Sequence, residues 1–307
     1  MGGIRCTVLQ PVATSRTQIN AMQSMYFMRC RCGRLYLNRF ITANGVVVNL
    51  SKIVYRHVFV RKYLNNMLVY QGMKLKNKII LITGASDGIG KQIALRLAKE
   101  GTQLALIARD EARLNEVVAK CKEIGATNAR AYLCDIRQTA KLASVIKKII
   151  SDFGHVNVLI NNAGVWQKLK SVDELDAESI DEVIETNLSA VIHTTNLLLP
   201  ILRQQKEAAI INICSKSGVV AQEKQSVYTA SKYGVRGFTE VLKADLKGSS
   251  VRVAGVYQSG TNTQLFAKVG DKPPIEKFTN PADLADVIAY MLSLPEKIWL
   301  HDVRVEY

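Results

Sequence analysis

The chain has 307 residues, 48% of them hydrophobic and 22% charged, so it can bury the core of at least one full domain. Its formal net charge of +15 suggests nucleic-acid binding until the charges are located. Residues 1–72 contain ten Lys and Arg and no Asp or Glu, and the remaining 31 Lys and Arg stand against 26 Asp and Glu. No basic stripe or interleaved aromatic surface accompanies them, so nucleic acid is not the expected partner.

The N-terminal segment, residues 1–72, differs from the rest of the chain. It lacks helical or strand periodicity, and none of its apolar runs is long enough to span a bilayer. Three interpretations stay open: an organelle transit peptide, a disordered or membrane-surface arm, or a segment foreign to the functional protein. We favour the third, since Met73 leads directly into the first strand of a domain at 73–307. We expect a cytoplasmic protein, or a mitochondrial one if the segment is a transit peptide.

The six cysteines predict neither a disulfide framework nor a metal site. Cys30 and Cys32 form a short pair without a second Cys or His pair, which a zinc site would need. Cys121, Cys134 and Cys214 are scattered, as is typical of buried thiols in a reducing compartment. The four histidines show no metal-ligand spacing either. We therefore expect no metal.

From residue 77 onward, short apolar runs alternate with helical patterns. We expect strands, buried on both faces, at 79–82, 103–108, 130–134, 156–160, 208–214, 251–257 and 302–306. We expect helices at 91–100, 111–124, 139–153, 177–203, 227–246 and 281–294. This alternation predicts an α/β fold, a single doubly wound, parallel, seven-stranded sheet with right-handed crossovers. Ligands should then bind at the carboxyl ends of the strands.

The first expected strand runs into the sequence Thr-Gly-Ala-Ser-Asp-Gly-Ile-Gly at residues 83–90, which opens a helix. Its glycines permit a tight turn and a close approach of the backbone to a diphosphate, and the helix start offers free N–H groups. The spacing, Gly-x3-Gly-x-Gly, differs from the commoner G-x-G-x-x-G. We expect this turn to bind a dinucleotide through Gly84, Ser86, Gly88, Ile89 and Gly90.

The end of the second strand bears on the choice of cofactor. Many NAD-binding proteins place an acidic residue there, on the ribose 2′-hydroxyl. Here the strand ends in Ala108, and Arg109 follows, which leaves room for a 2′-phosphate and a guanidinium to pair with it. Asp110 is better suited to cap the next helix. We therefore expect NADP rather than NAD, the alternative being that Arg109 is a solvated surface residue.

Further motifs follow in a fixed order. They are Asn-Asn-Ala-Gly at 161–164, Asn187 within the long helix, Ser215 at the end of the fifth strand, and Tyr228 with Lys232 four residues later. Each is modest alone, but together and at this spacing they resemble the short-chain dehydrogenase/reductase family over the whole expected domain. The resemblance implies a Rossmann-type, NAD(P)-dependent oxidoreductase. The chain departs from the family in one place, where Ser259-Gly260 replaces the usual Pro-Gly.

The resemblance also implies further cofactor contacts. Besides Tyr228 and Lys232, they are Asp135, Ile136, Asn162, Ala163, Gly164, Gly260 and Thr261. Asp135 corresponds to the family's adenine contact, and its alternative role is to cap a turn.

The residue types explain a possible chemistry at Tyr228. An unperturbed tyrosine has a pKa near 10, and Lys232, at i+4 on the same helix face, could place an ammonium close enough to lower it. Ser215 would donate a hydrogen bond to the substrate oxygen. The resemblance implies that Asn187 holds a water connecting Lys232 to solvent. The alternative is an ordinary helix pair with a solvated lysine.

Two classes of function are therefore expected. The first is an NADP-dependent oxidoreductase acting on a small alcohol or carbonyl, such as a 3-hydroxy acid, with a 3-oxoacyl carrier-protein reductase as the nearest rival. The second is a non-catalytic NAD(P)-binding regulator, which would need the glycines but not the four catalytic residues. Residues 261–280 are expected to form a substrate lid. Trp166 and Gln167 are predicted either to line the substrate entrance or to pack at the surface.

Apolar residues on two helices suggest self-association. The helix around Ile192 and the helix that carries Tyr228 have more apolar positions than one sheet face should need. Exposed apolar helix surface commonly marks a subunit contact, so we expect a homodimer or homotetramer. The alternative is that both helices pack wholly within one monomer.

Overall fold

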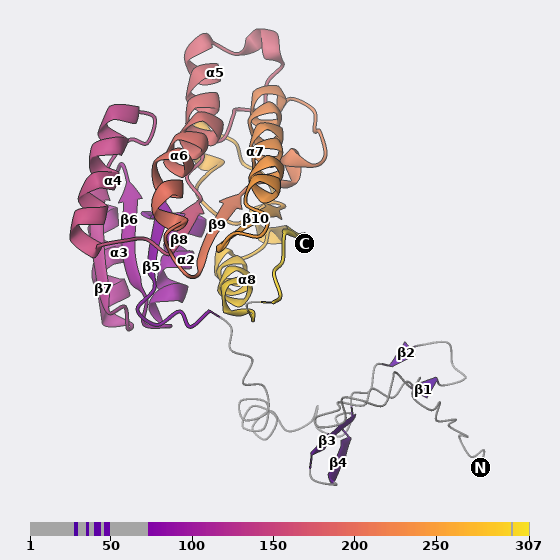
Figure 1. Cartoon of the computed structure of the whole chain (residues 1–307). Coiled ribbons are helices and arrows are strands. Elements are labelled where there is room, and N and C mark those ends of the chain that lie inside the picture. The colour runs from indigo at the N-terminus through magenta and orange to yellow at the C-terminus, as the bar shows by residue number, and fades with distance from the viewer. Residues whose placement is uncertain are drawn as a thin grey trace, which may run out of the picture. The chain divides into compact units, whose positions relative to one another are not determined.

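The computed structural model describes residues 73–295 and 297–306, together with four short N-terminal strands (Figure 1). The chain divides into two units, Met1–Tyr70 and Gln71–Tyr307. In the first unit, β1 (Met28–Arg29) pairs with β2 (Leu35–Tyr36) and β3 (Phe40–Ala43) with β4 (Val46–Asn49), both antiparallel. The other predictions for residues 1–72, Cys30 and Cys32 among them, lie outside the described residues.

The second unit contains the predicted parallel sheet. Its strands are β5 (Ile79–Thr83), β6 (Gln103–Ala108), β7 (Asn128–Leu133), β8 (Val158–Asn161), β9 (Ala208–Ile213), β10 (Val251–Gln258) and β11 (Asp302–Val305). They lie in the order β11-β10-β9-β8-β5-β6-β7, and every neighbouring pair is parallel. The predicted fold class is confirmed.

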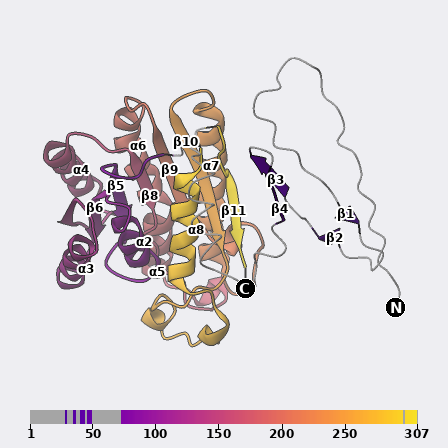
Figure 2. The same ribbon diagram turned by 90° about the horizontal axis from the view of Figure 1, so that it is seen from below.

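Helices cover both faces of this sheet (Figure 2). They are α2 (Gly88–Ala98), α3 (Glu111–Glu123), α4 (Thr139–Phe153), α5 (Ala177–Ile184), α6 (Ala190–Leu202), α7 (Ser226–Asp245) and α8 (Pro281–Ser293). Side chains of α2, α3 and α8 pack on one face, and those of α4, α6 and α7 on the other. Within the described residues, no helix is long and apolar enough to cross a membrane.

Burial on both faces was predicted for all seven strands, and for two of them the prediction is wrong. Strands β7 and β11 form the edges of the sheet, and their side chains alternate between more and less exposed positions. Leu133 at the end of β7, for example, is 42% exposed. The helical layers cover the centre of the sheet more completely than its edges, and the apolar content of a strand does not reveal its place in the strand order.

The long helix predicted at 177–203 is also interrupted. A single π-helical turn, Glu185–Ser189, separates α5 from α6 and contains Asn187. Such turns hold one residue more than an α-helical turn and occur often at functional sites. No Pro or Gly stands between Ala177 and Leu199 to mark this interruption in the sequence.

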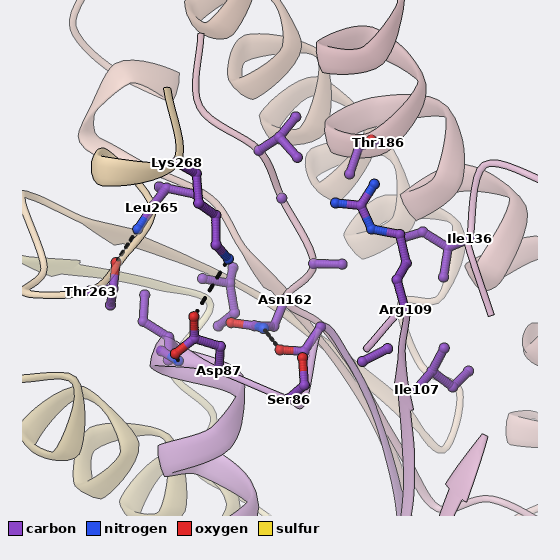
Figure 3. A pocket seen from close by; sticks show the side chains of 18 of the residues that line it. Ser86, Asp87, Ile107, Arg109, Ile136, Asn162, Thr186, Thr263, Leu265 and Lys268 are labelled. Carbon is purple, nitrogen blue, oxygen red and sulfur yellow. Dashed lines mark hydrogen bonds and ion pairs between the residues drawn. The ribbon is translucent and has the colours of Figure 1, made fainter. Parts of the chain in front are cut away.

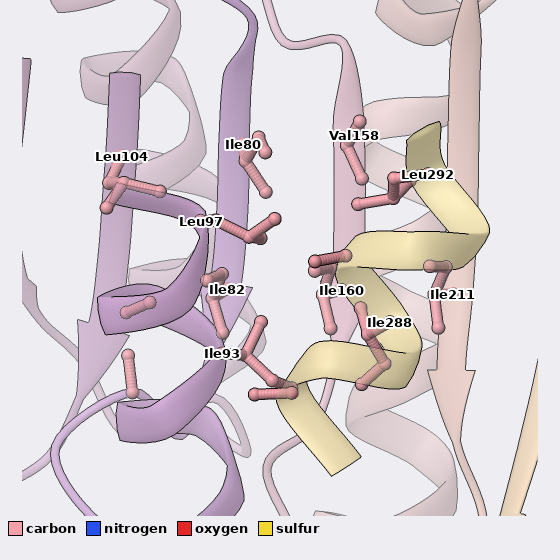
Figure 4. Close-up of a cluster of buried hydrophobic side chains, with 14 of the residues drawn as sticks. Ile80, Ile82, Ile93, Leu97, Leu104, Val158, Ile160, Ile211, Ile288 and Leu292 are labelled. Atoms are coloured by element: carbon pink, nitrogen blue, oxygen red, sulfur yellow. The ribbon is translucent and has the colours of Figure 1, made fainter. Parts of the chain in front are cut away.

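The hydrophobic core between the sheet and helices α2 and α8 supports the glycine-rich turn of the expected site (Figure 4). Ile80 and Ile82 of β5 and Ile160 of β8 are fully buried, and they pack in one cluster with Leu97 of α2 and Ile288 of α8. Fully burying one such side chain stabilises the fold by about 1.5–3 kcal/mol. This packing holds β5, α2 and the glycine-rich turn between them in place.

On the other side of the sheet, a chain of buried polar groups connects two strands with two helices. The Asn161 amide of β8 donates to Thr195 Oγ1 of α6 at 3.1 Å and to Asn212 Oδ1 of β9 at 2.8 Å. The Asn212 amide donates in turn to Thr239 Oγ1 of α7 at 2.8 Å. Because buried polar groups are costly unless paired, these bonds favour one alignment of α6 and α7 on the sheet.

Candidate active site

The glycine-rich turn between β5 and α2 is shaped by close backbone contacts. Gly84 and Gly88 have φ values of 66° and 53°, which favour glycine over other residues. A Cβ on Gly84 would lie 2.8 Å from Ala163 Cα, and one on Gly90 would collide with the carbonyl oxygen of Gly84 and the amide of Asn162. The turn thus allows the close backbone approach that a diphosphate requires, at the N-terminal end of a helix.

The helix after this turn begins earlier than predicted. α2 starts at Gly88 rather than Lys91, and Asp87 caps it by accepting a hydrogen bond from the Gly88 N–H at 2.7 Å. The last two glycines of the motif therefore belong to the first helical turn. Helix starts are hard to place from sequence where glycines begin the helix.

A cleft of about 1120 Å³ follows the carboxyl ends of β5, β6 and β8 (Figure 3). Most of the predicted cofactor contacts line it, namely Gly84, Ser86, Gly88, Ile89, Arg109, Asp135, Ile136, Asn162, Ala163, Gly164, Tyr228 and Lys232. Gly90 does not line the cleft, because it packs against the backbone of the turn itself. Gly260 and Thr261 line a second cavity instead. The glycine cradle and the position at the strand ends fit a bound dinucleotide.

One end of the cleft carries the residues predicted to choose the cofactor. Arg109 Nη1 lies 3.5 Å from Glu182 and 3.9 Å from Asp135, and about half of its side chain is exposed. Asp110 caps α3 as predicted, accepting from the Arg113 N–H at 3.0 Å. Asp135 is paired with Arg137 at 2.6 Å, and this hydrogen bond is the main cause that lowers the pKa of its carboxyl group. An adenine contact by Asp135 remains a prediction.

The sequence prediction missed several residues of this cleft. Asp87 lies 3.6 Å from Arg113 Nη1 and 3.5 Å from Lys268 Nζ, so two further cations border the turn (Figure 3). Thr263 and Leu265 line the cleft as well. Thr263, Leu265 and Lys268 belong to the segment predicted as a substrate lid. No local sequence pattern shows that this segment also runs along the cofactor cleft.

Tyr228 lies where the two cavities meet. It lines the dinucleotide cleft together with Lys232, and the second cavity, of about 1200 Å³, together with Ser215. Ser215 lies close enough to the Tyr228 hydroxyl to lower its pKa. The fold thus brings three of the four predicted catalytic side chains together: Ser215 from the end of β9, and Tyr228 and Lys232 from α7.

The pKa values in this structure differ from the expectation. Burial raises the pKa of Tyr228, and the interaction with the Ser215 side chain offsets this only in part. Burial likewise lowers the pKa of Lys232. The Lys232 Nζ lies 5.7 Å from the centre of the Tyr228 ring and donates to the Ile213 carbonyl at 3.3 Å, so it does not lower the phenol pKa as predicted. A protonated phenol at neutral pH can serve as a proton donor.

Asn187, the fourth predicted catalytic residue, is fully buried in the π-helical turn. Its amide accepts from the Val165 N–H at 2.8 Å and donates to the Val165 carbonyl at 3.0 Å and to Ser231 Oγ at 3.3 Å. The side chain therefore clamps the loop that follows β8. The water that it is predicted to hold next to Lys232 remains a prediction.

The second cavity has an aromatic wall beside Tyr228. The Trp166 ring lies edge-on to Tyr228 at 4.5 Å and to Phe266 at 4.9 Å, and its Nε1 donates to Asp271 at 2.8 Å. Trp166 thus lines the predicted substrate entrance, whereas Gln167 is buried and does not. The segment 261–280 contributes much of the remaining lining, and its role as a substrate lid stays a prediction.

Comparison with known proteins agrees with this geometry. A short chain dehydrogenase family model matches residues 78–274. An uncharacterized oxidoreductase of Staphylococcus saprophyticus is 31% identical over 234 residues, which cover 76% of this chain and 98% of the relative. The 3-oxoacyl-[acyl-carrier-protein] reductase of Thermotoga maritima is 29% identical over 229 residues, which cover 72% and 92%.

Solved structures show the same fold with a bound nucleotide. An alcohol dehydrogenase from the archaeon Thermococcus sibiricus, complexed with 5-hydroxy-NADP, is similar with a TM-score of 0.70 and 27% identity, covering 75% of this chain and 96% of that one. The chain therefore belongs to the short-chain dehydrogenase family, as the motifs predicted. It is an oxidoreductase of the NAD(P)-dependent kind.

The contacts of Gly90 make its replacement a test of the glycine cradle. Gly90→Ala forces a methyl group against the turn backbone, and we expect it to lower the free energy of unfolding by about 1–3 kcal/mol. The affinity for NADP should fall as well, measured by fluorescence titration. Gly237→Ala is the control: it lies in α7, where an added Cβ meets nothing within 4 Å, so neither quantity should fall. Equal behaviour of the two variants would contradict the proposed cradle.

Proposed function

We propose that the protein transfers a hydride between NADP(H) and a small alcohol or carbonyl substrate, such as a 3-hydroxy acid, with Tyr228 as the general acid and base. The observation that carries this proposal is the position of Tyr228, which borders both cavities and lines the second one together with Ser215. A reacting carbon in the second cavity would then lie beside the dinucleotide cleft.

When bound, the dinucleotide supplies or accepts the hydride. The chain's own residues supply the proton and the orientation. Ser215 and Tyr228 present two hydroxyl groups to a substrate oxygen, and Tyr228 Oη donates the proton as the oxygen becomes an alcohol. Lys232 lies beside the Tyr228 ring, and Gly164 packs closely on Asn187, where an added Cβ would lie 3.2 Å from the Asn187 Oδ1.

Two alternatives remain. One is a 3-oxoacyl carrier-protein reductase, which the similarity to the Thermotoga maritima enzyme supports. Activity on acyl-thioester substrates alone would favour it. The other is a non-catalytic NAD(P)-binding regulator, which would have no need of a buried Tyr228 beside Ser215.

NADP is the proposed cofactor because the end of β6 is small and is followed by Arg109, which borders the cleft. Arg113 and Lys268 also line this cleft and add positive charge to it. The 5-hydroxy-NADP in the Thermococcus sibiricus alcohol dehydrogenase is consistent with this choice. We further propose that 73–307 is the functional domain, located in the cytoplasm, or in mitochondria if residues 1–72 are a transit peptide.

The role of Tyr228 is tested with a panel of carbonyl substrates and NADPH. Tyr228→Phe removes the proton donor but keeps the ring, and we expect kcat to fall about 10²–10⁴-fold. The affinity for NADPH should change little, because the ring still lines the cleft. Unchanged turnover in the variant would rule out the proposed mechanism. Absence of turnover in the unmodified protein, with intact NADPH binding, would favour the regulator.

The role of Arg109 is tested by measuring the affinity for NADP and NAD separately. Arg109→Ala removes a charged hydrogen-bond donor, and we expect the Kd for NADP to rise roughly 10- to 100-fold. The Kd for NAD should stay nearly constant. Arg203→Ala, an exposed arginine at the end of α6, serves as the control. An equal loss for both dinucleotides would show that Arg109 does not read the 2′-phosphate.

We also propose that the protein forms a homodimer or homotetramer through α6 and α7. Ile192 on α6, and Tyr233 and Val241 on α7, are exposed. Val241→Asp would place a charge in such a contact, and light scattering at micromolar concentration should then report a smaller assembly. Val172→Asp is the matched control, because Val172 lies outside both helices and is equally exposed at 57%. A single-chain mass for the unmodified protein would contradict the assembly.

A further inference from the structure

Gln167 occupies an unusual place at the start of α7. It is only 3% exposed, and its Oε1 accepts two backbone hydrogen bonds, from the Val227 N–H at 2.9 Å and the Tyr228 N–H at 2.8 Å. Its Nε2 donates to the Lys224 carbonyl at 3.2 Å. One side-chain amide therefore binds both the first turn of α7 and the loop before it.

The first N–H groups of a helix have no partner within the helix, and a side chain from the preceding residue commonly binds them. At α7 that residue is Gln225, and it makes no such bond. Its amide is instead joined to Ser217 at 2.9 Å and to Gln222 at 3.3 Å. Gln167, in the loop after β8, thus supplies from far away in the sequence the cap that the local residues do not.

The loop that carries Gln167 is itself held firmly. Asn187 binds both the N–H and the carbonyl of Val165, two residues before Gln167. Trp166, between them, packs its ring on that of Tyr228 at 4.5 Å. The loop therefore contacts Tyr228 twice, through the aromatic ring and through the backbone N–H.

The bond to Lys224 adds a further constraint. Lys224 has a φ of 59°, a left-handed conformation that is uncommon for a residue with a side chain. Its carbonyl is the acceptor for Gln167. The turn that leads into α7 is thus held in a strained form by the same amide that caps the helix.

We propose that Gln167 is a positioning residue for Tyr228, fixing the backbone from which the phenol extends toward Ser215. This inference rests on the proposed function, in which Tyr228 transfers the proton. Misplacement of a reacting group by about 1 Å can lower the rate on the order of a hundredfold. Loss of the cap should therefore affect catalysis more than folding.

The pH profile separates positioning from a purely structural role. The nearby Ser215 side chain lowers the pKa of Tyr228, against the effect of burial. If Tyr228 moves away from Ser215, this lowering is lost and the pKa rises. In the oxidation of an alcohol, which needs the deprotonated phenol, the acidic limb of kcat should then move to higher pH.

The test compares Gln167→Met, which fills the same space without an acceptor, with Gln167→Glu, which retains an oxygen for both N–H groups. For Gln167→Met we expect kcat to fall on the order of a hundredfold, with KM for NADP nearly unchanged and Tm lower by roughly 2–4 °C. The acidic limb should move to higher pH. Gln167→Glu keeps the acceptor for both N–H groups and suits a helix start, but it loses the donor to the Lys224 carbonyl, so it should recover only part of the lost kcat.

Gln205→Met is the matched control, because Gln205 is a half-buried glutamine that donates to the Ile201 carbonyl at the end of α6, outside both cavities. Its kcat and pH profile should not change. The inference is overturned if Gln167→Met retains the original kcat, or if its pH profile stays in place. These outcomes presuppose an active unmodified enzyme that Tyr228→Phe inactivates, so failure of the proposed function would be recognised separately.

Discussion

Strand β5 lies between β6 and β8 in the sheet. From β6 the chain continues to β7 on one side of β5, and from β8 it continues to β9 on the other side. No crossover helix can cover the carboxyl ends of the strands at such a switch point, so a cleft forms there. The glycine-rich turn after β5, Arg109 after β6 and the Asn161–Gly164 motif at the end of β8 all border it. The packing of β5 against its two neighbours, with α2 and α8 on one side, therefore sets the geometry of the cleft and of the side chains that line it.

A second constraint is the burial of the groups proposed to be catalytic. Tyr228, Lys232 and Asn187 are all almost inaccessible to solvent, and buried polar groups lower stability unless they are paired. The structure pairs them through backbone groups: Lys232 with Ile213, and Asn187 with Val165. These hydrogen bonds reduce the cost of burying the side chains and also fix their positions. The site is therefore preorganised, and the same burial shifts the pKa values.

The segment after β10 connects the two cavities. Lys268 approaches the glycine-rich turn through Asp87, while Phe266 and Asp271 contact Trp166 beside Tyr228. One short stretch of chain therefore closes the dinucleotide cleft on one side and the second cavity on the other. Ser259-Gly260, the departure from the usual Pro-Gly, lies at the start of this stretch, where Gly260 packs so closely on Phe278 that an added Cβ would lie 2.7 Å from the ring.

Local sequence determined the strands and helices, their order along the chain, the cap at Asp110, and most of the motif residues that line the cleft, because these depend on periodicity and on motifs within a few residues. Tertiary structure alone decided which strands are edges, where the π-helical turn interrupts the long helix, and that Lys268 reaches the glycine-rich turn. It also decided the direction of the Tyr228 pKa shift and the capping of α7 by Gln167. These features depend on burial and on contacts between residues up to 181 positions apart, from Asp87 to Lys268, which no local pattern encodes.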